Sequence, residues 1–180
     1  KCMDYLEMNK DDNSLKGQIR LGYALSLSEN GNPRKAFEIV QDLISSELPA
    51  FSQGKGTKDP GADLIRPDQW SLSLLRASYD ILWKLFRESH ELIYLRKAAE
   101  TSSLIVAIID NVRLNIDEEE SRLILGDRYR DYYIFAIRDC DICYRATGEK
   151  HYIYKAFELS ERSKAAALLT ATRELKATQF

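Results

Sequence analysis

Apolar residues recur along most of the chain at intervals of three and four, a spacing that places them on one face of an α-helix. One such stripe consists of Trp70, Leu74, Ala77, Ile81 and Leu85. No convincing alternation of apolar and polar residues, the pattern of a half-buried β-strand, accompanies it. The sequence therefore predicts an all-α protein.

Turn signals divide this pattern into antiparallel helix pairs at about residues 14–47, 68–112 and 117–178, with a proline-bounded loop at 49–67. Gly31 suits the end of one helix, and Asn32-Pro33 suits the cap and first residue of the next. Asp117 is the expected N-cap of a later helix, in which we expect a bend or break near Gly126. About seven helices are expected in all.

A tetrapeptide recurs in the first turns of the second helix of each pair. Residues 35–38 and 155–158 read KAFE, and residues 97–100 read KAAE, at separations of 62 and 58 residues. The alanine lets two helices approach closely, and small residues continue along the last helix at Ser160, Ser163 and Ala167. A pair cannot bury both of its sides alone, so the pairs should stack as an α-solenoid.

The repeat resembles a degenerate tetratricopeptide repeat (TPR). In the first copy the matching positions are Tyr23, Ala24, Leu27, Gly31, Ala36, Val40 and Leu43, with Pro49 one residue late. The later copies fit only with extra residues at the turn between the helices, and their spacing exceeds the 34-residue period of the family. The resemblance implies one TPR-like domain over residues 1–180, stacked as a right-handed superhelix.

Composition narrows the class of protein. The 180 residues are 44% hydrophobic and 30% charged, which excludes a disordered chain. A net charge of -2 gives no general attraction to nucleic acid or to an anionic membrane, and no apolar run approaches the ~18 residues of a membrane span. Three cysteines are too few for a disulfide framework, which favours reduced thiols and a cytoplasmic location. The first residue is Lys1 and not Met, so we expect a fragment of a longer protein or a processed chain.

The motifs that could carry chemistry have simpler interpretations. Cys140 and Cys143 form a CxxC without the second pair that a zinc site needs, and their mid-helix position favours packing over redox chemistry. The two histidines, His90 and His151, fall at turns. Residues 54–57 lack the full phosphate-loop pattern, and the acidic residues 117–120 are better explained as a helix cap than as a metal cluster. No catalytic residue, metal or cofactor is predicted.

Six of the ten tyrosines lie between Tyr129 and Tyr154, interleaved with arginines. Mixtures of aromatic residues and arginine are typical of binding surfaces. Tyrosine also packs in helical cores with only its hydroxyl exposed, and this core interpretation is favoured. The surface interpretation stays open.

The last helix carries a second resemblance, in residues 156–165, which read AFELSERSKA, and in the paired leucines Leu168 and Leu169. This stretch resembles the final TPR helix before the CHAT domain, which is named for caspase-like proteins associated with these repeats. A weaker resemblance extends back to about Trp70. The resemblance to the CHAT family implies a bacterial protein in which the repeats bind a partner and a cysteine peptidase domain follows. The catalytic His and Cys of that domain have no counterparts in this chain.

These observations predict a protein-interaction scaffold that binds through a groove lined by the first helix of each pair. The repeat pattern nominates Gln18, Asp80, Lys84, Arg87, Arg138 and Arg145. The expected partner is a protein or peptide, with the chain's own C-terminal peptidase domain as one candidate, and not nucleic acid or a membrane. The alternatives are a structural module that self-associates and the sensor region of another bacterial signalling protein. An all-helical enzyme would need a convergent polar constellation that the sequence does not supply.

Overall fold

The computed structural model describes residues 2–48, 69–115 and 119–177 and shows that they are helical throughout, apart from turns. Its helices are α1 (Cys2–Glu29), α2 (Pro33–Glu47), α4 (Gln69–Ser89), α5 (Leu92–Asn115), α6 (Glu119–Thr147) and α7 (Lys150–Ala177). No strand occurs within these residues, which confirms the all-α prediction.

Some details differ from the expectation. The first helix begins at Cys2, well before the expected start near Ser14. The sequence does not predict this earlier start, because the first turns of the helix lack a regular apolar stripe. Gly126 lies inside α6, which is one helix from Glu119 to Thr147, so no break occurs there. The described ranges contain six helices where about seven were expected. The predicted loop at 49–67 and the predicted cap at Asp117 lie outside them.

Each turn that joins paired helices contains one residue in the left-handed backbone conformation. Its φ angle is +81° at Gly31, +57° at His90 and +72° at Gly148. The predicted helix end at Gly31 is therefore confirmed, and Pro33 is the first residue of α2 as expected. Asn32 occupies the cap position without a side-chain cap, and its amide donates instead to the Asn30 carbonyl at 3.3 Å.

Two of these turns share the same hydrogen bonds. The left-handed residue donates its N–H to a carbonyl four residues earlier, at 2.8 Å for His90 and 2.7 Å for Gly148. The preceding hydroxyl, of Ser89 or Thr147, accepts the N–H of the glutamate after the turn, at 3.2 Å in both cases. Equivalent residues of the second and third pairs thus form the same local structure.

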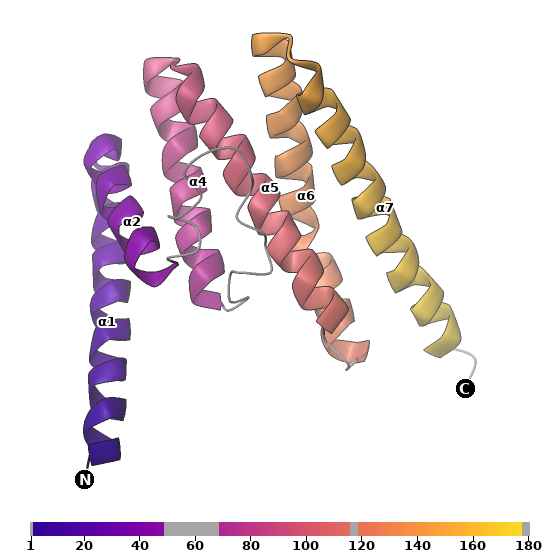
Figure 1. Ribbon diagram of the computed structural model, residues 1–180. Coiled ribbons are helices and arrows are strands. Elements are labelled where there is room, and N and C mark those ends of the chain that lie inside the picture. Colours follow the sequence, from indigo (N-terminus) through magenta and orange to yellow (C-terminus); the bar gives the residue numbers. More distant parts are fainter. Residues whose placement is uncertain (1, 49–68, 116–118, 178–180) are drawn as a thin grey trace.

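The three pairs lie side by side in chain order, from α1 and α2 through α4 and α5 to α6 and α7 (Figure 1). Within each pair the two helices pack together, and the second helix of a pair also packs against the first helix of the next, α2 on α4 and α5 on α6. Each boundary between pairs therefore uses the same kind of helix contact.

The alanines of the recurring tetrapeptide are buried where helices pack together. Ala36 and Ala98 are fully buried, and Ala156 is 8% exposed. Ala36 belongs to the apolar cluster shared by the first two pairs, and Ala156 packs with side chains of α5 and α6. The small side chain lets neighbouring helices approach at all three positions, as the sequence indicated.

Ion pairs also recur between successive pairs of helices. Arg34, directly before the first KAFE, lies 3.5 Å from Glu91, and Arg96, directly before KAAE, donates from Nη1 to Glu149 at 3.3 Å. Each glutamate directly follows the left-handed residue of the next pair. Further along the molecule, Asp110 of α5 accepts bonds from Tyr133 of α6 and Arg162 of α7.

Candidate binding pocket

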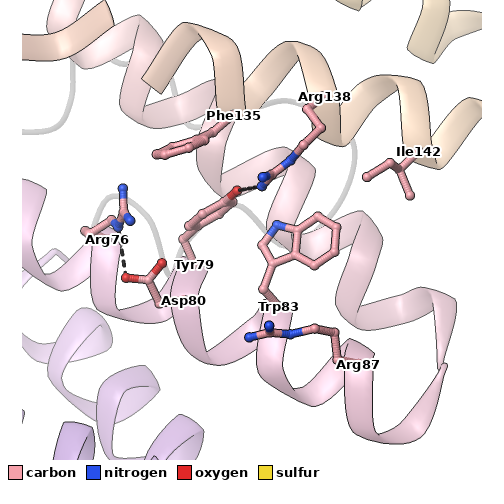
Figure 2. Close-up of a pocket in the computed structure, with 8 residues that line it drawn as sticks. All are labelled: Arg76, Tyr79, Asp80, Trp83, Arg87, Phe135, Arg138 and Ile142. Atoms are coloured by element: carbon pink, nitrogen blue, oxygen red, sulfur yellow. Dashed lines mark hydrogen bonds and ion pairs between the residues drawn. The ribbon is translucent and has the colours of Figure 1, made fainter. Parts of the chain in front are cut away.

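A pocket of about 580 Å³ lies between α4 and α6, the first helices of the second and third pairs. Its volume falls within the ~300–1,000 Å³ of small-ligand sites. We call it the α4–α6 pocket, and Figure 2 shows its lining: Arg76, Tyr79, Asp80, Trp83 and Arg87 from α4, with Phe135, Arg138 and Ile142 from α6.

Helical spacing explains why these residues gather. The α4 residues of the lining are separated by one, three or four positions, as are those of α6, so each set occupies one face of its helix. Other faces of α4 carry the buried stripe with Leu74, Ile81 and Leu85. Packing that stripe into the core turns the polar and aromatic face of α4 toward α6.

Aromatic rings connect the two helices at the pocket. Tyr79 of α4 stacks on Phe135 of α6 with ring centroids 6.1 Å apart. The guanidinium carbon of Arg76 lies 5.0 Å from the Phe135 centroid, and that of Arg138 lies 5.1 Å from Trp83 and 5.3 Å from Phe135. These cation–π contacts place two guanidinium groups beside aromatic rings of the pocket.

A buried carboxylate fixes the position of Arg138. Asp139 is fully buried, and its Oδ1 accepts bonds from Arg138 Nη2 at 3.2 Å and from the Tyr79 hydroxyl at 3.3 Å. Arg138 Nη2 also donates to the Tyr79 oxygen at 2.8 Å, the contact drawn in Figure 2. The three groups form one network that links α4 to α6.

Burial sets the proton affinities in this network. It raises the pKa of Asp139, although hydrogen bonds and the Arg138 charge oppose the shift. Burial and then the nearby Asp139 charge raise the pKa of the Tyr79 hydroxyl. Tyr79 therefore remains a hydrogen-bond donor at neutral pH.

The lining carries more positive than negative charge. It contains three arginines and a single carboxylate, Asp80, which accepts a 2.8 Å bond from Arg76 Nε. Burial lowers the pKa of Arg76, but Asp80 outweighs this effect and the net shift is upward. Arg87 is exposed and has no ion-pair partner among the described residues. Among the described residues, the Arg87 guanidinium thus forms no ion pair with a carboxylate.

The structure brings together half of the six nominated residues. Asp80, Arg87 and Arg138 line the α4–α6 pocket. Gln18 is an exposed residue of α1 outside its lining.

Lys84 and Arg145 lie on the two pocket helices but have other contacts. The Lys84 ammonium donates to the Ser28 carbonyl in the last turn of α1, where a cation stabilises the helix end. Arg145 Nε donates to Asp141 at 2.8 Å on an exposed surface of α6. Neither residue lines the pocket.

The sequence did not nominate the remaining pocket residues, Arg76, Tyr79, Trp83, Phe135 and Ile142. Most of these residues lie three or four positions from Asp80 or Arg138, a spacing that places them on the same helix face and could have indicated them. Aromatic residues at helical spacing are, however, equally typical of a core, and the spacing within α4 does not show which ring α6 will contact.

The cysteines and histidines occupy places that fit their structural interpretation. Cys140 and Cys143 are buried, and burial raises their pKa values to about 11 and about 12, so both remain thiols at neutral pH. His90 is exposed at the turn between α4 and α5, whereas His151, expected at a turn, is exposed in the first turn of α7. Across residues 2–48, 69–115 and 119–177, no group of three His, Cys, Asp or Glu side chains could hold a metal ion.

The tyrosine-rich region contributes to both core and surface. Tyr133 and Tyr152 are buried, whereas Tyr154 is 70% exposed. The favoured core interpretation thus holds for Tyr133 and Tyr152, and Tyr154 is a surface residue.

Comparison of the chain with protein-family models, with curated proteins and with solved structures gives no significant match. In the part of the chain that the structure describes, every helix is too short or too polar to cross a membrane.

Proposed function

We propose that the chain is part of a TPR-type α-solenoid, a right-handed stack of helix pairs that serves as a protein-interaction scaffold. The repeated ion pairs of Arg34 and Arg96 support this architecture, as do the matching turns at His90 and Gly148. Contacts that recur between successive pairs are the expected property of a stacked repeat.

The α4–α6 pocket is the proposed binding site for another polypeptide. The observation that carries this proposal is the position of the pocket between the first helices of successive pairs, lined by Trp83, Tyr79 and arginines. Tryptophan, tyrosine and arginine are the residues that contribute most energy at protein interfaces. On this proposal the region binds in the cytoplasm and catalyses no reaction.

The resemblance of residues 156–165 to the TPR helix before a CHAT domain suggests a more specific role. In this role the repeats form the regulatory region of a bacterial caspase-like protein, and its peptidase domain is one candidate partner. The sensor region of another bacterial signalling protein is the corresponding alternative.

A random peptide library displayed on phage tests the binding function. Panning against the wild-type chain should select peptides whose affinity falls at least about tenfold in Arg138→Glu, since a loss of about 1.4 kcal/mol corresponds to a factor of ten. Arg145→Glu is the matched control, because Arg145 lies on the same helix outside the pocket. Selection of no peptide, or of peptides unaffected by Arg138→Glu, would refute the proposed site.

A self-assembly module is a second candidate, favoured by exposed apolar side chains on both terminal helices. These are Leu15, Ile19 and Tyr23 of α1, with Tyr154 and Phe157 of α7. Such residues are typical of surfaces that associate. Light scattering over a range of protein concentrations distinguishes the two functions, because assembly predicts a rising mass and a pocket-binding monomer predicts a constant one.

A further inference from the structure

We propose that the α4–α6 pocket selects an acidic side chain, Asp or Glu, flanked by apolar residues in an extended peptide. This inference rests on the proposed function, because it names the chemistry of the polypeptide that the pocket would bind. Three features of the pocket support it: its charge, the fixed orientation of Arg76 and Arg138, and its apolar wall.

The charge of the lining is complementary to a carboxylate. Asp80 neutralises Arg76, but no acidic side chain of the lining pairs with Arg87. Arg138 is bonded through Nε and Nη2 to Asp139 and Tyr79, and its side chain is still 48% exposed. A guanidinium has five N–H donors, so Arg138 can bind a further acceptor without giving up its network. A carboxylate is the acceptor that arginine binds most strongly.

The orientation of these arginines lowers the cost of binding. Arg138 is held by the buried Asp139, with its guanidinium carbon 5.1 Å from the Trp83 ring centroid, and Arg76 is held by Asp80, with its guanidinium carbon 5.0 Å from the Phe135 ring centroid. A guanidinium has five N–H donors, so these contacts leave donors available for a ligand. Because the Arg76 and Arg138 side chains are already ordered, binding a carboxylate to them costs little additional rotamer entropy.

The wall of the pocket suits apolar neighbours of the acidic residue. Trp83, Phe135 and Ile142 contribute rings and an aliphatic side chain beside the guanidinium groups (Figure 2). A nucleic acid would supply negative charge as well, but the chain as a whole carries a net charge of -2. Phosphate binding by nucleic-acid proteins typically relies on an extended basic surface. An acidic peptide therefore fits this pocket better than a nucleic acid strand.

Fluorescence anisotropy with three labelled peptides tests the inference on the full chain. The peptides are Leu-Glu-Leu, Leu-Gln-Leu and Leu-Lys-Leu within the same neutral flanks, with both ends blocked so that the glutamate supplies the only carboxylate. We expect the Glu peptide to bind at least about tenfold more tightly than the Gln peptide, and this preference to weaken as salt increases.

Variants identify the groups responsible. Arg87→Gln and Arg138→Gln should each remove most of the preference for Glu over Gln, and Arg145→Gln should leave it unchanged. Asp80→Asn should strengthen binding of the Glu peptide, because it removes the carboxylate that competes for Arg76. Arg87 and Asp80 are exposed, so their substitutions should not disturb folding even if Arg138→Gln does.

The outcomes separate this inference from the proposed function. Equal binding of the Glu and Gln peptides, with both lost in Trp83→Ala, would leave the pocket as a peptide site and overturn the acidic preference. Displacement of the Glu peptide by a single-stranded oligonucleotide at comparable concentration would also overturn it, in favour of a phosphate ligand. If no tested or library-selected peptide binds the pocket, the proposed function itself fails.

Discussion

At the scale of single residues, the three turns between paired helices place different side chains in the same left-handed conformation. Two turns use glycine, which adopts positive φ at little cost, and the second uses His90 at φ +57°. The sequence allowed Gly31 to be predicted, because glycine is typical of helix ends. It gave no such signal at His90, where the β-carbon disfavours the conformation and the neighbouring hydrogen bonds impose it.

This difference predicts that His90→Gly stabilises the protein by about 0.5–1 kcal/mol. The substitution relieves a left-handed β-carbon that costs about 1–2 kcal/mol, and part of the gain is lost with the contact between His90 and the Phe86 ring. Urea unfolding followed by circular dichroism measures the change. Gly148→Ala is the converse control, since it adds a β-carbon at φ +72° and should destabilise by a similar amount. A destabilising His90→Gly would show that the ring contact contributes more than the backbone strain.

Single buried polar residues explain why much of the pocket was not foreseen. Asp139 interrupts the apolar stripe of α6, and nothing in its spacing shows that it will hold Arg138 and accept a bond from Tyr79. Arg138 was nominated from the repeat pattern alone. Its network depends on a contact between residues 59 positions apart, which the sequence of one helix cannot encode.

At the scale of the helices, amphipathic spacing and turn residues were sufficient to place most boundaries. The predicted pairs at 68–112 and 117–178 correspond to α4 with α5 and α6 with α7. The early part of α1 was missed because its sequence lacks a regular apolar stripe. Spacing also identified which residues share a face of α4, but not that this face would meet the aromatic side chains of α6.

Close helix packing at the recurring alanine predicts that Ala98→Leu destabilises the protein by about 1–3 kcal/mol, the usual cost of overpacking. Ala98 is fully buried in a cluster with Tyr79 and Leu82, so the larger leucine side chain would displace α4 from α5. It would also shift the Tyr79 ring, which lines the α4–α6 pocket. Ala165→Leu is the matched control, because Ala165 is exposed on α7 and its substitution should change stability by less than about 0.5 kcal/mol. Equal effects of the two substitutions in urea unfolding would contradict close packing at Ala98.

At the scale of the whole molecule, residues at equivalent positions of the repeat differ in burial, depending on whether another helix packs against them. Phe37 and Phe157 occupy the same position of the two KAFE segments. Phe37 is partly buried against the second helix pair, with the Lys97 ammonium 5.7 Å from its ring centroid. Phe157 is 68% exposed on α7, the last helix of the described chain. The repeat identified the equivalence of the two residues, whereas their different burial depends on neighbours that the repeat does not specify.

This contrast predicts unequal effects of the same substitution. Phe37→Ala should destabilise the protein by about 1–2 kcal/mol, less than the ~3–5 kcal/mol of a fully buried phenylalanine, because Phe37 is only partly covered. Phe157→Ala should change the free energy of unfolding by less than about 0.5 kcal/mol, because water already contacts most of its ring. Urea unfolding of both variants at low protein concentration measures the difference. If Phe157→Ala proves as costly as Phe37→Ala, and the cost grows with protein concentration, then a second copy covers α7 in solution and the self-assembly function gains support over a monomeric scaffold.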